Sequence, residues 1–178
     1  PRDMTRAAGF YNTLLLAGEP AIVIEVLNGY RVKERMPSNI GELTVLPGIP
    51  EIMHIGKDAT IVTYGACVRI ALEAAEKLAA AGIEAEVIDI QSLLPFDLHG
   101  RIGESLRKTG RVLFVDEDVP SGTSAYMLRE VLEVHGGYQW LDSAPRTLPG
   151  AAHPPPNGTA PDYRSKPNAE TIFKEVYT

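Results

Sequence analysis

Three consecutive carboxylates, Asp116, Glu117 and Asp118, are the densest group of side chains in this sequence that could do chemistry. They follow an apolar run, residues 112–115, that has the pattern of a buried strand. Parallel sheets bind ligands at the carboxyl ends of their strands, so a hard cation is one interpretation. Adjacent residues at a strand end diverge, however, and cannot all face one ion. We therefore favour helix capping or interface charge, and we assign no metal ligand.

Gly65 and Asp89 have the spacing of a phosphate turn and a ribose-binding acid. The segment GACVRI lacks the second and third glycines that let a pyrophosphate approach the backbone, so we do not expect a dinucleotide site. Cys67 lies near a predicted helix start, which lowers a thiol pKa, but no base is nearby in the sequence. A buried packing cysteine is favoured.

The remaining candidates for chemistry also lack a partner pattern. The four histidines, His54, His99, His135 and His153, have no zinc-ligand spacing among themselves. No GxSxG nucleophile motif occurs. We therefore assign no catalytic and no cofactor-binding residue to this sequence.

The elements that would position these side chains begin with one strand, helix, strand unit. Residues 59–64 form a short apolar run, residues 67–81 carry apolar side chains at helical spacing, and residues 83–90 read as a second strand. Gly82 fits the left-handed end of the helix. The two strands should be parallel and joined by a right-handed crossover.

The same alternation continues towards the C-terminus. Asp97 is placed to cap a helix reaching about Lys108, residues 112–115 form the third strand, and a further helix runs from Ser121 or Gly122 to Val134. A proline-rich surface loop starts at His153. Asn168 should cap a final helix through Tyr177. This order predicts an α/β fold: a three-layer αβα domain with a mainly parallel five-stranded sheet.

The N-terminal region predicts a piece of a second α/β domain. Residues 3–17 read as a helix and residues 21–26 as a buried strand, and the two cannot cover each other's apolar surface. Their natural partners are expected outside this sequence. Residues 27–55 have the proline and glycine content of a linker, with one short edge strand at 41–46. Three cations in this linker form a solvated or interdomain surface rather than a phosphate site: Arg31, Lys33 and Arg35.

Several segments together resemble a known family. TIVTYG, AGIEAEVIDI and SLLPFD resemble the start of the transketolase C-terminal domain. Along the rest of the chain, NGYRVKERMPSNIGE, KTGRVLFVDED, LDSAPRTLPG and KPNAETIFKEV are similar to the beta subunit of the thiamine-dependent first component of 2-oxo acid dehydrogenase complexes. The resemblance implies three parts: residues 1–27 from a pyrimidine-binding domain, an interdomain linker at 28–56, and a transketolase C-terminal-like domain at 57–178.

The resemblance also implies an activity for the full enzyme. That activity is oxidative decarboxylation of a 2-oxo acid and reductive acylation of a lipoyl group, with thiamine diphosphate and magnesium bound by parts absent here. This part would serve subunit assembly and docking, and alone it should be inactive. Implied partners are an alpha-type subunit or domain, a second beta-type copy, and a lipoyl-bearing acyltransferase. Asp142 matches an acidic family position for acyltransferase docking, although Ser143 reads as an insertion beside it.

Composition limits the remaining choices. The 178 residues carry a net charge of −6, which gives no support for a nucleic-acid surface. One cysteine excludes an internal disulfide, and no apolar stretch approaches the roughly 20 residues that span a bilayer. We expect a cytoplasmic location and no membrane contact. Two alternatives stay open: a fragment of transketolase or deoxyxylulose phosphate synthase, and a non-catalytic interaction module.

Overall fold

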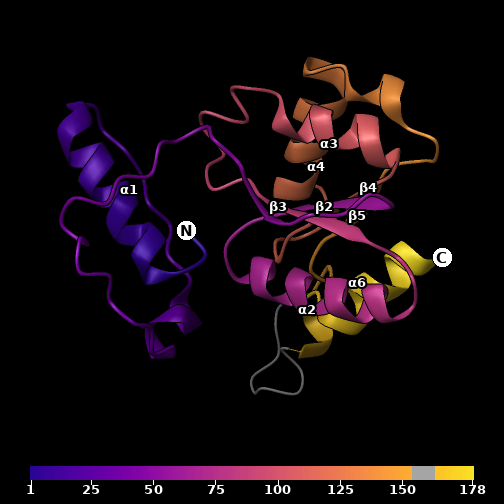
Figure 1. Ribbon diagram of the computed structural model, residues 1–178, viewed down its shortest axis with the longest axis horizontal. Coiled ribbons are helices and arrows are strands. Elements are labelled where there is room, and N and C mark those ends of the chain that lie inside the picture. The colour runs from indigo at the N-terminus through magenta and orange to yellow at the C-terminus, as the bar shows by residue number, and fades with distance from the viewer. Residues whose placement is uncertain (154–162) are drawn as a thin grey trace.

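In the computed structural model, which describes residues 1–153 and 163–178, a five-stranded sheet lies between two layers of helices (Figure 1). The strand order is β1-β3-β2-β4-β5; all neighbours are parallel except β1, which pairs antiparallel with β3. The strands are β1 Glu51–His54, β2 Ala59–Thr63, β3 Ala85–Asp89, β4 Val112–Val115 and β5 Arg146–Leu148. The predicted three-layer, mainly parallel fold is confirmed.

The central unit is β2, helix α2 (Ala66–Ala80) and β3. Every residue of β2 and β3 is buried, as expected for strands covered on both faces. The buried side of α2 includes Val68, Ala75 and Leu78, which follow the helical period. Gly82 adopts φ +84, the left-handed conformation predicted at the end of this helix.

The two faces of the sheet have separate cores. Helices α2 and α6 (Ala169–Tyr177) cover one face, where Ile61, Leu78 and Ile172 are buried. Helices α3 (Arg101–Thr109) and α4 (Thr123–Arg129) cover the other face over Phe114 and Met127. Figure 1 shows these pairs below and above the strands. The chain therefore leaves β2 and β5 for one face of the sheet and β3 and β4 for the other.

Side-chain caps define two helix starts. The Asp97 carboxylate accepts from the N–H groups of Arg101 and Ile102 at 2.9 and 3.0 Å, so the predicted cap is confirmed although the helix itself begins at Arg101. Asn168 and Thr171 form a reciprocal capping box at the start of α6. Beyond α4 the helix continues as the π-turn η2 (Glu130–Val134) and the 3-10 turn η3 (Gly137–Trp140).

Two strand predictions are wrong. Residues 21–26 form no strand, because a strand needs a neighbour for its backbone groups and none lies beside this segment among the described residues. Residues 41–46 form a turn and loop rather than an edge strand. The edge is instead β1, which lies at the end of the segment predicted as linker. The short strand β5 was not predicted either.

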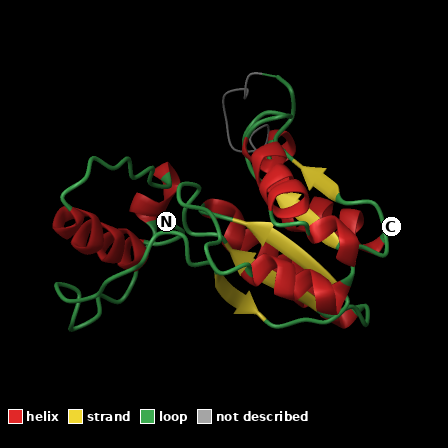
Figure 2. Ribbon diagram, turned by 90° about the horizontal axis from the view of Figure 1, so that it is seen from above, coloured by secondary structure: helices red, strands yellow, loops and turns green. Residues whose placement is uncertain are grey.

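Residues 1–46, here called the N-terminal arm, stand apart from the sheet (Figure 2). They hold helix α1 (Met4–Ala17), which confirms the helix predicted at residues 3–17 and is capped by Asp3, and the 3-10 turn η1 (Leu27–Arg31). Helix α1 packs on the arm's own loop, where the Asn12 amide donates to the carbonyls of Ile40 and Leu43 at 2.9 and 2.8 Å.

Two further expectations concern the proline-rich loop and membrane-spanning helices. The predicted proline-rich loop lies mostly outside the described residues, which stop at 153 and resume at 163. Among the described residues, no helix has the length and apolar content needed to cross a bilayer.

Candidate functional site

The carboxyl edge of the sheet contains a topological switch point between β2 and β4. The chain leaves β2 for α2 on one face and leaves β4 for α4 on the other, and open α/β sheets bind ligands in such crevices. Gly65 follows β2 with φ +56 and ψ −131, a conformation open essentially only to glycine. Asp116, Glu117 and Asp118 follow β4.

Asp116 is the buried member of the three carboxylates, with 1% of its surface exposed. Its Oδ2 accepts a short hydrogen bond from the Ser124 N–H, which anchors the start of α4. Oδ1 has no hydrogen-bond partner among the described residues. Burial raises the pKa of the Asp116 carboxyl to about 6, and the Ser124 backbone N–H opposes that rise.

Glu117 and Asp118 have partners of their own. Glu117 Oε2 lies 3.0 Å from the Lys166 ammonium, and Asp118 Oδ1 accepts from the Val119 N–H at 2.8 Å. The three carboxylates thus engage three different groups. In the described part of the chain no three His, Cys, Asp or Glu side chains gather closely enough to hold a metal ion. These residues do not fit a magnesium-diphosphate site.

The raised pKa of Asp116 predicts a pH-dependent effect of Asp116→Asn. The folded chain binds this proton up to about pH 6, whereas an unfolded aspartate releases it near pH 4, so the parent loses stability as the pH rises through that window. At about pH 7.5 the amide, which can still accept from Ser124, should raise the unfolding free energy by about 1–2 kcal/mol. The gain should vanish near pH 4. Urea unfolding at both pH values measures it, and an equal gain at both would contradict the buried charge.

Cys67 and Asp89 both have structural partners. Cys67, in the first turn of α2, is buried in the core, and burial raises the pKa of its thiol to about 12; the prediction of a packing cysteine is confirmed. Asp89 lies at the end of β3, where its Oδ2 is 2.8 Å from the Arg2 guanidinium. Gly65 and Asp89 therefore do not face a shared nucleotide crevice: Asp89 binds the arm.

The four histidines and the three linker cations are exposed or have structural contacts of their own. His54 Nδ1 lies 2.8 Å from the Ala85 carbonyl oxygen, and the His135 ring lies against Phe96 at 6.1 Å between centroids. His99 and His153 are exposed. The three linker cations are exposed on the arm: Arg31, Lys33 and Arg35.

Asp142 lies beside the C-terminal end of α3. Its side chain is exposed and lies against Gly110, and its N–H donates to the Gly110 carbonyl at 2.8 Å. Two residues earlier, Trp140 stacks under the Arg107 guanidinium, 4.6 Å from the ring centroid. The segment that carries Asp142 thus also carries an aromatic ring paired with a cation of α3.

The two helical layers, the parallel sheet with one antiparallel edge, and the switch point define a domain of the transketolase C-terminal class. Residues 50–166 match the family "Transketolase, C-terminal domain", and the chain belongs to that family. A solved structure described as a split gene transketolase, inactive beta4 tetramer, is similar with a TM-score of 0.60 and 28% identity, covering 77% of this chain and 44% of that one.

Individual relatives are similar over most of the chain. A 2-oxoisovalerate dehydrogenase subunit beta of Bacillus subtilis is 31% identical over 94% of this chain and 47% of its own length. A mitochondrial pyruvate dehydrogenase E1 component subunit beta-1 of Arabidopsis thaliana is 38% identical over 71% of this chain and 34% of its own. The chain spans about half or less of the length of these relatives.

The structure contains one cluster of charged residues that the sequence did not predict. Arg2, Arg6, Glu51 and Asp89 meet at the antiparallel edge of the sheet. No local pattern signals it, because its members are separated by up to 87 positions and only the pairing of β1 with β3 brings the two carboxylates together.

Proposed function

We propose that this chain is the C-terminal part of the beta-type subunit of a thiamine diphosphate-dependent 2-oxo acid dehydrogenase. The observation that carries the proposal is the similarity to a 2-oxo acid dehydrogenase beta subunit across 94% of the chain. The reaction would be oxidative decarboxylation of a 2-oxo acid followed by reductive acylation of a lipoyl group. This part would support assembly and docking.

The cofactor in this proposal is bound by segments other than the described residues. Thiamine diphosphate would supply the electron sink of the decarboxylation, and magnesium would hold its diphosphate. Proposed partners are an alpha-type subunit or domain, a second beta-type copy and a lipoyl-bearing acyltransferase.

A transketolase is the second candidate, favoured by the similar split gene transketolase. Its identity to this chain is 28%, whereas the pyruvate dehydrogenase beta subunit of Arabidopsis thaliana is 38% identical. The first proposal therefore has the stronger support. The encoding gene and its neighbours test the choice, since a dehydrogenase predicts an acyltransferase gene with a lipoyl domain nearby.

The first expected result is that the 178-residue chain does not bind the cofactor by itself. Titration calorimetry with thiamine diphosphate and magnesium should give no binding signal, because the described residues offer no site for the metal-diphosphate pair. Micromolar binding would contradict the proposed division of the active site.

The second expected result concerns Asp142 as a docking residue. Its exposed carboxylate should attract a basic binding domain of the acyltransferase, and such attraction acts mainly on the association rate and weakens with salt. Asp142→Lys should lower the association rate about three- to tenfold at low ionic strength. Surface plasmon resonance with the immobilised binding domain measures the rate.

A matched variant separates docking from net charge. Glu19→Lys changes the total charge equally but lies on the exposed arm, so it should leave the association rate close to that of the parent. Equal rates for the parent and Asp142→Lys at low salt would remove Asp142 from the docking surface while leaving the rest of the proposal standing.

A further inference from the structure

Two carboxylates face each other at the antiparallel edge of the sheet. Glu51 of β1 and Asp89 of β3 are direct cross-strand partners. Like charges in this position repel, and the Asp89 side chain is only 2% exposed, so water screens that repulsion poorly. A pair of this kind requires a cation to be stable in the folded chain.

The cation comes from the N-terminal arm. Arg2 Nη1 lies 2.8 Å from Glu51 Oε2 and 2.8 Å from Asp89 Oδ2, so one guanidinium nitrogen bridges the two carboxylates. Arg6 Nη2 donates to the second oxygen of Glu51 at 2.5 Å. The remaining oxygen of Asp89 accepts from the Gln91 N–H at 3.0 Å. All four carboxylate oxygens are therefore satisfied.

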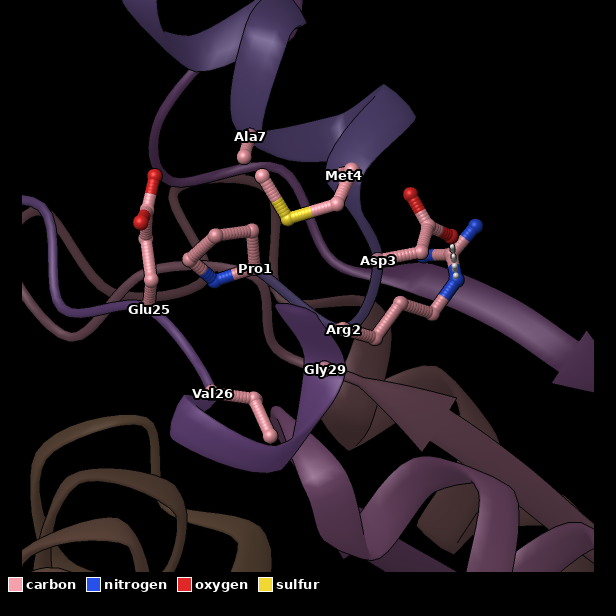
Figure 3. A pocket seen from close by; sticks show the side chains of 8 residues that line it. All are labelled: Pro1, Arg2, Asp3, Met4, Ala7, Glu25, Val26 and Gly29. Carbon is pink, nitrogen blue, oxygen red and sulfur yellow. Dashed lines mark ion pairs between the residues drawn. The ribbon is translucent and has the colours of Figure 1, made fainter. Parts of the chain in front are cut away.

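The ion pairs of Arg2 also involve the start of helix α1. Arg2 also lies 3.3 Å from Asp3, the residue that caps α1, so the cap and the bridge are linked. Figure 3 shows that ion pair beside a small pocket, with Pro1 and Met4 on one side and Val26 on the other. Arg2, just before the cap, and Arg6, in the first turn of α1, thus both reach the strands from the start of the helix.

No other polar contact ties the arm to the strands. Among the described residues, every hydrogen bond and ion pair from residues 1–46 to β1–β5 comes from Arg2 or Arg6. Helix α1 itself packs on residues 40–46 of the arm. The polar contacts that set the orientation of the arm relative to the strands are therefore made by four charged side chains.

We propose that Glu51 and Asp89 form an arginine-binding socket, and that Arg2 and Arg6 fasten the N-terminal arm to the sheet through it. A guanidinium stays charged at every accessible pH and is more weakly hydrated than an ammonium, so it suits a pair of carboxylates of which one is almost fully buried. The socket fixes the direction in which the segment before the domain enters it. This inference holds whether or not the proposed enzymatic function is correct.

The distance between α1 and the sheet layer tests the proposal in the 178-residue chain. Spin labels at Leu15→Cys and Glu76→Cys report it, because both positions are exposed and the native Cys67 is buried with a pKa of about 12, too high for ready labelling. The parent should give a narrow distance distribution. Arg2→Met/Arg6→Met should lose it, and a narrow distribution at the parent distance would overturn the proposal.

A second double variant distinguishes loss of the socket from loss of folding. Glu51→Gln/Asp89→Asn removes both charges but leaves no buried carboxylate unpaired, so the sheet should stay folded by circular dichroism while the narrow distance distribution is lost. Retention of the narrow distribution would overturn the socket. Arg146→Met, which breaks a half-exposed pair with Glu175 far from the arm, is the control and should leave the distribution unchanged.

Discussion

The Gly56→Ala variant is expected to lose about 3 kcal/mol or more of unfolding free energy, a large fraction of the roughly 5–15 kcal/mol that stabilises an ordinary domain. A Cβ at Gly56 would overlap the backbone of residues 84–86 at the start of β3. The loop cannot move away, since the N–H groups of Lys57 and Asp58 both donate to the Glu84 carbonyl, at 2.9 and 3.0 Å. Urea unfolding followed by circular dichroism measures the loss.

Gly103→Ala is the matched control for that experiment. Gly103 lies inside α3 and a Cβ there meets no atom within 4 Å. The substitution should therefore stabilise the chain by about 0.5–1 kcal/mol, because alanine loses less backbone freedom in a helix. If both alanine variants unfold at the same urea concentration as the parent, the close approach of residue 56 to β3 does not exist in solution.

Lys108→Met should have the second largest effect. Glu86 of β3 has a side chain only 1% exposed, and its Oε2 is held by a short ion pair with Lys108 Nζ and a long hydrogen bond of 3.4 Å from the Gly56 N–H. Removing the ammonium leaves a buried carboxylate without its counter-charge. Since Lys108 is 42% exposed and water screens the pair in part, we expect a loss of about 2–3 kcal/mol.

Two further variants show whether that loss comes from the buried charge. Glu86→Gln/Lys108→Met should recover most of the stability, because the carboxylate is gone as well. Lys57→Met breaks the exposed pair with Glu84 and should cost less than about 1 kcal/mol. A loss for Lys108→Met no larger than that of Lys57→Met would mean that Glu86 does not depend on the lysine.

The central part of the fold follows from local sequence. The β2-α2-β3 unit was predicted because its strands are short apolar runs and its helix repeats apolar residues every three to four positions. The caps Asp97 and Asn168 were predicted because their side chains bond N–H groups only a few residues away. Interactions between residues close in the chain leave a local pattern, so a single sequence is enough to predict them.

The edges of the fold could not be predicted in this way. Residues 21–26 have the composition of a strand but pair with no strand in the described part of the chain, whereas Glu51–His54 lies in a proline-rich stretch and pairs with β3. Strand β5, only three residues long, exists because β4 lies beside it. Strand pairing depends on what lies alongside, and that is a property of the assembled sheet.

The candidate sites also divide into local features, which the sequence predicted, and long-range contacts, which it did not. Sequence alone identified the carboxylates after β4 and predicted a buried Cys67, because strand ends and helix faces are local features. Only the tertiary structure brought Arg2 to Asp89 and buried Asp116 Oδ1 where no described residue hydrogen-bonds it. Burial and long-range ion pairs depend on which elements stack, and electrostatic interactions become strong only where that stacking excludes water.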